Sequence, residues 1–159
     1  MRRNILKLVF VMAVAMILFN GCGGPIMYNY AGAEGKKLMG YLSDGDAESF
    51  KAMFCEKTQS TDNFDEQIQM AMDFFDGKII SWDDMILSGG EEESTRKGKT
   101  VIRYISPQIN DIKTDTGKTY EILFYGYLVN AEHEDYVGIS ELHITADDGS
   151  ECVVGEFTD

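Results

Sequence analysis

The sequence predicts an α+β domain in which short N-terminal helices pack on a curved, mainly antiparallel sheet. Two observations lead to this fold class. Apolar residues recur at helical spacing up to residue 77, and from residue 78 onward they alternate with polar residues as in strands. Three short segments typical of hairpin turns separate the later strands: 97–99, 115–118 and 147–150. Helices followed by consecutive hairpins indicate an α+β arrangement.

Residues 1–21 have the features of a bacterial export signal peptide. Residues 8–19 form an apolar core, which is too short to cross about 30 Å of hydrocarbon as a mature helix. The core follows a positively charged start made by Arg2, Arg3 and Lys7. A basic start, a short apolar stretch and small residues after it are typical of a secretory signal.

Gly21 and Cys22, at the end of this signal, resemble the lipobox of bacterial lipoproteins. In such proteins the chain is cut before the cysteine, whose thiol carries a diacylglyceryl group with palmitate-type chains. Two or three acyl chains hold a protein firmly on a membrane. The alternative is an ordinary secretory cut that leaves Cys22 as a free thiol. We therefore expect an extracytoplasmic protein that is lipid-anchored to the cell membrane through Cys22.

The composition limits the kinds of partner. Removing residues 1–21 leaves 138 residues and changes the formal charge from −13 to −16, because the signal holds three of the 14 Lys+Arg and no Asp or Glu. A chain this acidic repels the phosphate backbones of nucleic acids. We therefore expect no nucleic-acid partner. Solubility alone explains the acidity; cationic peptides, metal ions and basic wall components stay open as partners.

The segment 22–34 lacks periodicity and is expected to be a lipidated tether, followed by one domain over 35–159. Three helices are predicted there from apolar stripes at helical spacing. The first stripe holds Leu38, Met39 and Leu42, and the second holds Phe50, Met53 and Phe54. The third begins near Asn63, with Glu66 as a capping-box partner, ends near Gly77 and contains Phe64, Ile68, Met72 and Phe75. Met70 and Met72 are expected in the core.

Strands are expected over 78–87, 95–97, 100–105, 108–113, 119–129, 138–145 and 151–157. The segment 119–129 should be central, because both of its faces are apolar, and such a strand is covered on both sides. Helices would cover one face. The other carries Tyr125 and Tyr127, which we expect to form an interaction face, most simply in a homodimer. The alternative is that this row is covered within one chain.

Five segments resemble an uncharacterised lipoprotein family of Gram-positive, clostridia-type bacteria, domain of unknown function 5104. They are FCEKT (54–58), MDFFDGKI (72–79), ISPQI (105–109), KTDTGKTY (113–120) and VGIS (137–140). The resemblance implies a cone-shaped fold of the nuclear-transport-factor-two, cystatin-like type. It supplies no catalytic residues.

Several motifs point to chemistry but fit structural roles better. The Gly-Lys-Thr triplets at 98–100 and 117–119 lack the earlier glycine of a phosphate-binding loop and are expected to be turns. His133 lies in an acidic loop, which solvated charge explains without a metal. Cys55 and Cys152 could form one disulfide, but two free thiols are favoured.

Two functional hypotheses remain. The first is a non-enzymatic domain that binds a small molecule, peptide or protein, with no cofactor, metal or catalytic residue. The second is a pocketed enzyme, isomerase- or hydrolase-like, with Asp83 or Asp84 as general base beside Trp82. Because no catalytic motif is recognisable in the sequence, the first hypothesis is favoured.

Overall fold

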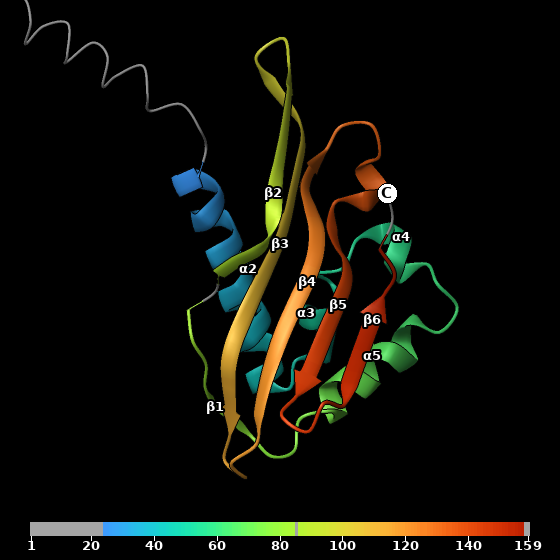
Figure 1. Ribbon diagram of the computed structural model, residues 1–159. Helices are drawn as coiled ribbons and strands as arrows, with labels where there is room; N and C mark the ends of the chain where they lie inside the picture. The colour runs from blue at the N-terminus through green and yellow to red at the C-terminus, as the bar shows by residue number, and fades with distance from the viewer. Residues whose placement is uncertain (1–23, 85, 158–159) are drawn as a thin grey trace, which may run out of the picture.

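The computed structural model describes residues 24–84 and 86–157 (Figure 1). In this part of the chain the helices come first: α2 (Gly24–Asp44), α3 (Ala47–Lys51), α4 (Glu56–Gln59) and α5 (Phe64–Asp73). The strands follow: β1 (Ile79–Ser81), β2 (Ile86–Arg96), β3 (Lys99–Thr114), β4 (Thr119–Asn130), β5 (Gly138–Ala146) and β6 (Glu151–Gly155). A 3₁₀ turn, η1 (Glu134–Tyr136), lies between β4 and β5. This order confirms the α+β class.

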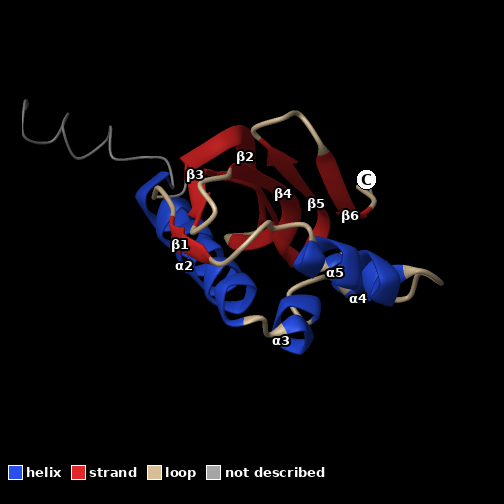
Figure 2. Cartoon of the chain, turned by 90° about the horizontal axis from the view of Figure 1, so that it is seen from below, coloured by secondary structure: helices blue, strands red, loops and turns tan. Residues whose placement is uncertain are grey.

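The strands form one antiparallel sheet in the order β1-β3-β4-β5-β6, and β2 also pairs with β3. The sheet is curved and does not close, and the helices lie on its concave side (Figure 2). β4 is central, as the sequence predicts. Its residue Ile122 pairs with Ile109 of β3 on one side and with Ile144 of β5 on the other.

β3 is longer than predicted, because it runs through Pro107 without a break where two strands, 100–105 and 108–113, were expected. Proline has no N–H to donate, so a sheet accepts it at edges or irregularities. Here Pro107 lies opposite Leu87, and the pairing register shifts immediately beyond, between Leu87 and Glu91. The irregularity of β2 therefore accommodates the proline.

The turn between β2 and β3 is the predicted hairpin. Lys97 and Gly98 both have positive φ, 52° and 75°, as a two-residue type I′ turn requires. The single strand expected over 78–87 is interrupted in the structure. The chain leaves the sheet after β1, at Ser81, and returns to it with β2, at Ile86.

The concave face of the sheet and the helices enclose one apolar core. Its largest fully buried side chains are Leu38, Met39, Phe50, Phe64, Ile105, Ile109, Ile112, Ile122, Phe124, Leu142, Ile144 and Val154. Phe54 lies edge-on to Phe50 and Phe64, with ring centroids 5.4 and 5.2 Å apart, and so joins the segments around α3 and α5. Burying one such side chain stabilises the fold by about 1.5–3 kcal/mol.

The segment expected to be an irregular tether is helical from Gly24 onward, which corrects the prediction. Pro25 stands in the first turn, where a proline costs no hydrogen bond. Ala31 is fully buried, and α2 packs against β1, β2 and β3. Tertiary packing thus stabilises a helix whose own apolar periodicity is weak. Among the described residues, no helix is long and apolar enough to span a membrane.

α5 ends at Asp73, before the predicted end near Gly77, and it corrects two further details of the prediction. Asn63 precedes the helix, but its side chain makes no capping bond to the backbone; instead its Oδ1 accepts a hydrogen bond from Gln67 Nε2 at 3.0 Å. Met70 is 54% exposed, whereas Met72 packs against the core. Residues two apart project about 200° apart around a helix, so the two methionines cannot both face the sheet.

Candidate functional site

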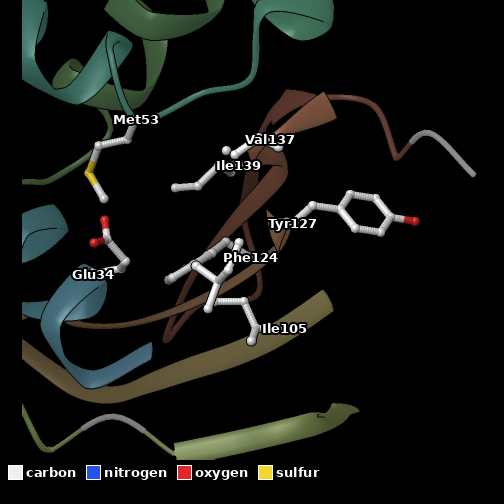
Figure 3. A pocket seen from close by; sticks show the side chains of 10 residues that line it. Glu34, Met53, Ile105, Phe124, Tyr127, Val137 and Ile139 are labelled. Carbon is white, nitrogen blue, oxygen red and sulfur yellow. The ribbon is translucent and has the colours of Figure 1, made fainter. Parts of the chain in front are cut away.

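A pocket of about 220 Å³ lies between α2, the segment joining α3 to α4, and strands β3 to β5. In Figure 3, Glu34 and Met53 face Ile105, Phe124 and Ile139 across it. The complete lining is Glu34, Met53, Ile105, Phe124, Gly126, Tyr127, Leu128, Val137, Gly138 and Ile139. The only carboxylate in this lining is that of Glu34.

The segment at residues 53–55 forms one wall by continuing the sheet beside β5. The Ile139 N–H donates to the Met53 carbonyl and the Cys55 N–H donates to the Ile139 carbonyl, both at 2.9 Å. Thr58 supports this wall, since its hydroxyl donates to the Ser140 carbonyl at 3.0 Å. The wall is therefore fixed by hydrogen bonds as well as by apolar packing.

Two glycines allow the chain segments around the pocket to approach closely. A Cβ on Gly126 would lie 2.4 Å from the carbonyl oxygen of Gly138. Gly138 has φ +127°, and a Cβ there would lie 2.8 Å from the Cys55 nitrogen. Any larger residue would force these segments apart. Glycines within the predicted strands were thus the sequence signal for this site, which the analysis of motifs missed.

The pocket combines a buried apolar wall with a polar rim. Ile105, Phe124 and Ile139 are almost fully buried, whereas Val137 is 42% exposed. The side chain of Glu34 is 32% exposed, and its Oε1 accepts a hydrogen bond from Lys37 Nζ at 2.7 Å. That hydrogen bond and the charge of Glu34 raise the pKa of Lys37. Such a site can hold a small apolar group next to one fixed negative charge.

The predicted interaction face lies on the other, convex side of the sheet, where an aromatic cluster is formed by Tyr104, Tyr125, Tyr127 and Phe157. Tyr104 lies edge-on to Tyr127 at 5.5 Å and to Phe157 at 5.9 Å between ring centroids. Phe157 also contacts Tyr125 at 5.8 Å. Tyr127 also borders the pocket, but its ring points away from it (Figure 3).

The C-terminal segment after β6 holds Phe157 over this cluster. The Phe157 N–H donates to Glu141 Oε2 at 2.6 Å, and the same carboxylate pairs with His143. Burial, followed by electrostatic repulsion from Tyr125, Tyr127 and Glu141, raises the pKa of Tyr104 to about 12. The chain itself therefore covers part of the row that was expected to contact a partner. Tyr104 and Phe157 were not predicted to belong to this face, because they lie far apart in the chain.

Trp82, Asp83 and Asp84 do not reach the pocket. All three are exposed on the connection between β1 and β2, and none is among the pocket-lining residues. The Asp83 N–H donates to the Asn110 carbonyl at 3.0 Å, which ties the connection to β3. The structure thus places this segment at the sheet edge, away from the pocket.

The histidine and cysteine residues considered in the sequence analysis lie in surroundings that fit structural roles. His133 stacks on Tyr136 with ring centroids 4.9 Å apart. No group of three or more metal-ligating side chains is found within residues 24–84 and 86–157. Cys55 and Cys152 are both buried free thiols, which confirms the alternative that was favoured over a disulfide. Gly21 and Cys22 lie outside the described residues.

A second hollow, of about 620 Å³, lies at the other side of the domain between α5 and β6. Carboxylates of Glu66, Asp73 and Glu151 border it. Its apolar members include Met70 and Val153, which are 54% and 39% exposed. It is more open than the pocket beside Glu34.

Comparison with known families assigns the chain to one of them. Residues 37–147 match the family model described as Domain of unknown function (DUF5104). The match spans more than half of the chain, and the chain belongs to this family. No curated protein matches the chain.

Proposed function

We propose that this protein is a membrane-anchored extracytoplasmic lipoprotein of Gram-positive bacteria whose domain binds a ligand without catalysing a reaction. The anchor is supported by the basic start, the short apolar core and the Gly21-Cys22 pair. The described domain would then begin with α2, close to the membrane surface. The strongly acidic composition favours a body that stands off anionic headgroups.

The observation that carries the binding role is the pocket beside Glu34. Ligand pockets usually measure about 300–1,000 Å³ and combine apolar walls with a few polar groups. At about 220 Å³, this pocket matches that chemistry and suits a small ligand or one end of a larger one. Its walls come from segments far apart in the chain, so the fold holds the site in shape.

The enzyme hypothesis has less support, because its two aspartates lie on the exposed β1–β2 connection. A general base must come within hydrogen-bond reach of the proton that it removes from a bound substrate. Neither Asp83 nor Asp84 lines the pocket. A binding role requires no such base.

We also infer that the fold is of the cone-shaped, cystatin-like type. The supporting observations are the curvature of the open sheet and the helices on its concave side (Figure 2). In such an arrangement a pocket between helices and sheet is a natural place for a ligand.

The anchor is tested with Cys22→Ser in the native host. We expect the variant to leave the membrane fraction or to accumulate as unprocessed precursor, since the thiol that takes the lipid is lost. A processed variant that stays in the membrane fraction would contradict the lipid anchor. Wild-type protein in the same fractionation is the control.

The binding role is tested by replacing exposed Val137 at the rim with tryptophan, which should fill the mouth of the pocket without disturbing the core. Val153→Trp is the matched control, because Val153 is equally exposed but lies in the second hollow. Mature protein is purified from membranes and examined by native mass spectrometry for small molecules that accompany it. We expect a bound molecule in wild type and Val153→Trp that is absent from Val137→Trp. Equal occupancy in all three proteins would contradict binding in this pocket.

A further inference from the structure

We propose that the pocket selects small cationic amphiphiles, organic ammonium compounds with a short apolar chain, and that Glu34 is the counterion of their charged group. This inference rests on the proposed function, because it concerns the ligand of the same pocket. It follows from the position of one carboxylate at the rim of an otherwise apolar site.

The apolar wall sets the first requirement. Ile105, Phe124 and Ile139 offer no side-chain donor or acceptor, so a polar group placed against them would lose its hydration without compensation. Met53 adds a flexible, polarizable side chain opposite them (Figure 3). The inner end of the ligand must therefore be apolar. The volume of about 220 Å³ limits it to a short chain or a small ring.

The carboxylate of Glu34 sets the second requirement. Glu34 lines the pocket, and its carboxylate points towards the Met53 side chain (Figure 3). Its neighbour Ala31, one turn earlier on α2, is fully buried, so the helix is held firmly against the domain at this point. A partly desolvated carboxylate with a fixed position interacts more strongly with a cation than an exposed one does. A ligand that fills the pocket brings its head group to this carboxylate.

The ion pair between Glu34 and Lys37 does not prevent Glu34 from binding the head group of a ligand. Lys37 is one turn away on the same helix, its side chain is 54% exposed, and it does not line the pocket. Exposed ion pairs at this spacing are weak. Lys37 donates to one of the two carboxylate oxygens, Oε1, so a ligand ammonium can approach the other, Oε2. Lys37 thus competes with the ligand ammonium for the Glu34 carboxylate but does not block the pocket.

The surrounding charge also favours cations. The acidic residues Glu132, Glu134 and Asp135 are exposed in the segment that leads into Val137 at the rim. The formal charge of the chain is −13. Such a field raises the local concentration of cations and repels anions, so an apolar carboxylate of equal size should be rejected.

The experiment compares three probes that have the same chain and different head groups: hexylammonium, 1-hexanol and hexanoate. Mature lipoprotein in amphipol, with ¹³C-labelled methionine and isoleucine methyl groups, is titrated with each probe. The methyl signals of Met53 and Ile139 report occupancy of the pocket itself. We expect hexylammonium to bind at least about tenfold more tightly than 1-hexanol, which corresponds to about 1.4 kcal/mol. We expect hexanoate to bind most weakly.

Two variants test the role of Glu34. In Glu34→Gln the advantage of hexylammonium over 1-hexanol should disappear, while 1-hexanol binds as in wild type. Glu48→Gln makes the same charge change on α3 outside the pocket and should keep the advantage. Lys37→Gln removes the competing cation and should tighten hexylammonium binding about twofold, a difference of a few tenths of a kcal/mol.

The outcomes separate this inference from the proposed function. If 1-hexanol binds as tightly as hexylammonium, or if Glu34→Gln keeps the preference, the pocket binds ligands but the cationic class is wrong. If hexanoate binds best and Lys37→Gln abolishes it, the site is selective for anions. If no probe shifts the Met53 and Ile139 signals, the proposed binding role of the pocket fails together with the inference.

Discussion

The two faces of β4 are both apolar in sequence, but the fold covers them very differently. On the concave face, Ile122 and Phe124 are 0% and 1% exposed, because the helices pack over them. On the convex face, Leu123 and Tyr125 are only half-buried. Phe157, from the C-terminal segment, is the aromatic residue that lies across that side.

The two faces of β4 therefore have different roles. The concave face should stabilise the domain, and the convex face should take part in its surface interactions. The concave face belongs to a close-packed core, apart from the pocket that Phe124 lines together with Glu34 and Met53. The convex face is an aromatic surface with partial cover from one end of the chain. Loss of a side chain should therefore strongly lower the stability of the protein in the first case and mainly alter its contacts in the second.

The largest expected effect comes from neighbouring aromatic residues on the two faces. Phe124→Ala should lower the free energy of unfolding by about 3–5 kcal/mol, as for a fully buried phenylalanine. Tyr125→Ala should cost clearly less, because its side chain is only partly buried before the change. Urea unfolding of both variants in amphipol measures this difference. Equal losses would show that the convex face is as tightly packed as the core.

A somewhat smaller loss is expected from Gly126→Ala, which adds a single carbon between the strands. That carbon would meet the backbone oxygen of Gly138 at 2.4 Å, and backbone cannot move aside as a flexible side chain can. We expect a loss of about 1–3 kcal/mol, the usual cost of overpacking. Gly98→Ala is not a clean control, because Gly98 has positive φ. Gly40→Ala is a suitable comparison, because a Cβ there meets nothing within 4 Å and alanine is favoured over glycine inside α2, so this variant should lose no stability.

The convex face gives a prediction about association. We propose, as the sequence predicts, that Tyr125 and Tyr127 contact a second copy of the chain. Sedimentation equilibrium of the mature protein should show a dimer that the double variant Tyr125→Glu/Tyr127→Glu dissociates, because the charges would be buried at the interface. A wild-type protein that stays monomeric at high concentration would rule out this dimer. Phe157 would then be sufficient cover for the row.

The smallest effect should come from the ionisation of Tyr104. Its pKa is raised to about 12, first by burial and then by nearby negative charge, so the unfolded chain ionises at lower pH than the folded one. The contribution of this group to stability is therefore complete below about pH 10 and is lost as the pH rises towards 12. Tyr104→Phe should flatten the decline of the unfolding free energy over this range relative to wild type. Parallel curves for the two proteins would contradict the shift.

The sequence by itself determined the local parts of this structure. Apolar periodicity identified the helical stripes around Leu38 and Phe64, and the central position of β4 followed from its two apolar faces. The second stripe was only partly right, because α3 ends at Lys51 and Phe54, expected on the same helix as Phe50, pairs with Ile139 instead. The Lys97-Gly98 turn was also predictable, because positive φ at both positions is a local requirement. These features depend on residues close together in the chain.

Only the tertiary structure decided how distant segments meet. It brought Glu34 of α2 to the rim formed by Val137, placed Phe157 on Tyr104, and made a helix of the expected tether. It also turned Met70 outward, against the prediction. Periodicity specifies which face of an element is buried, but not which other element covers that face. That choice depends on long-range packing, on register shifts such as the one at Gly126, and on the space that the glycines leave between segments.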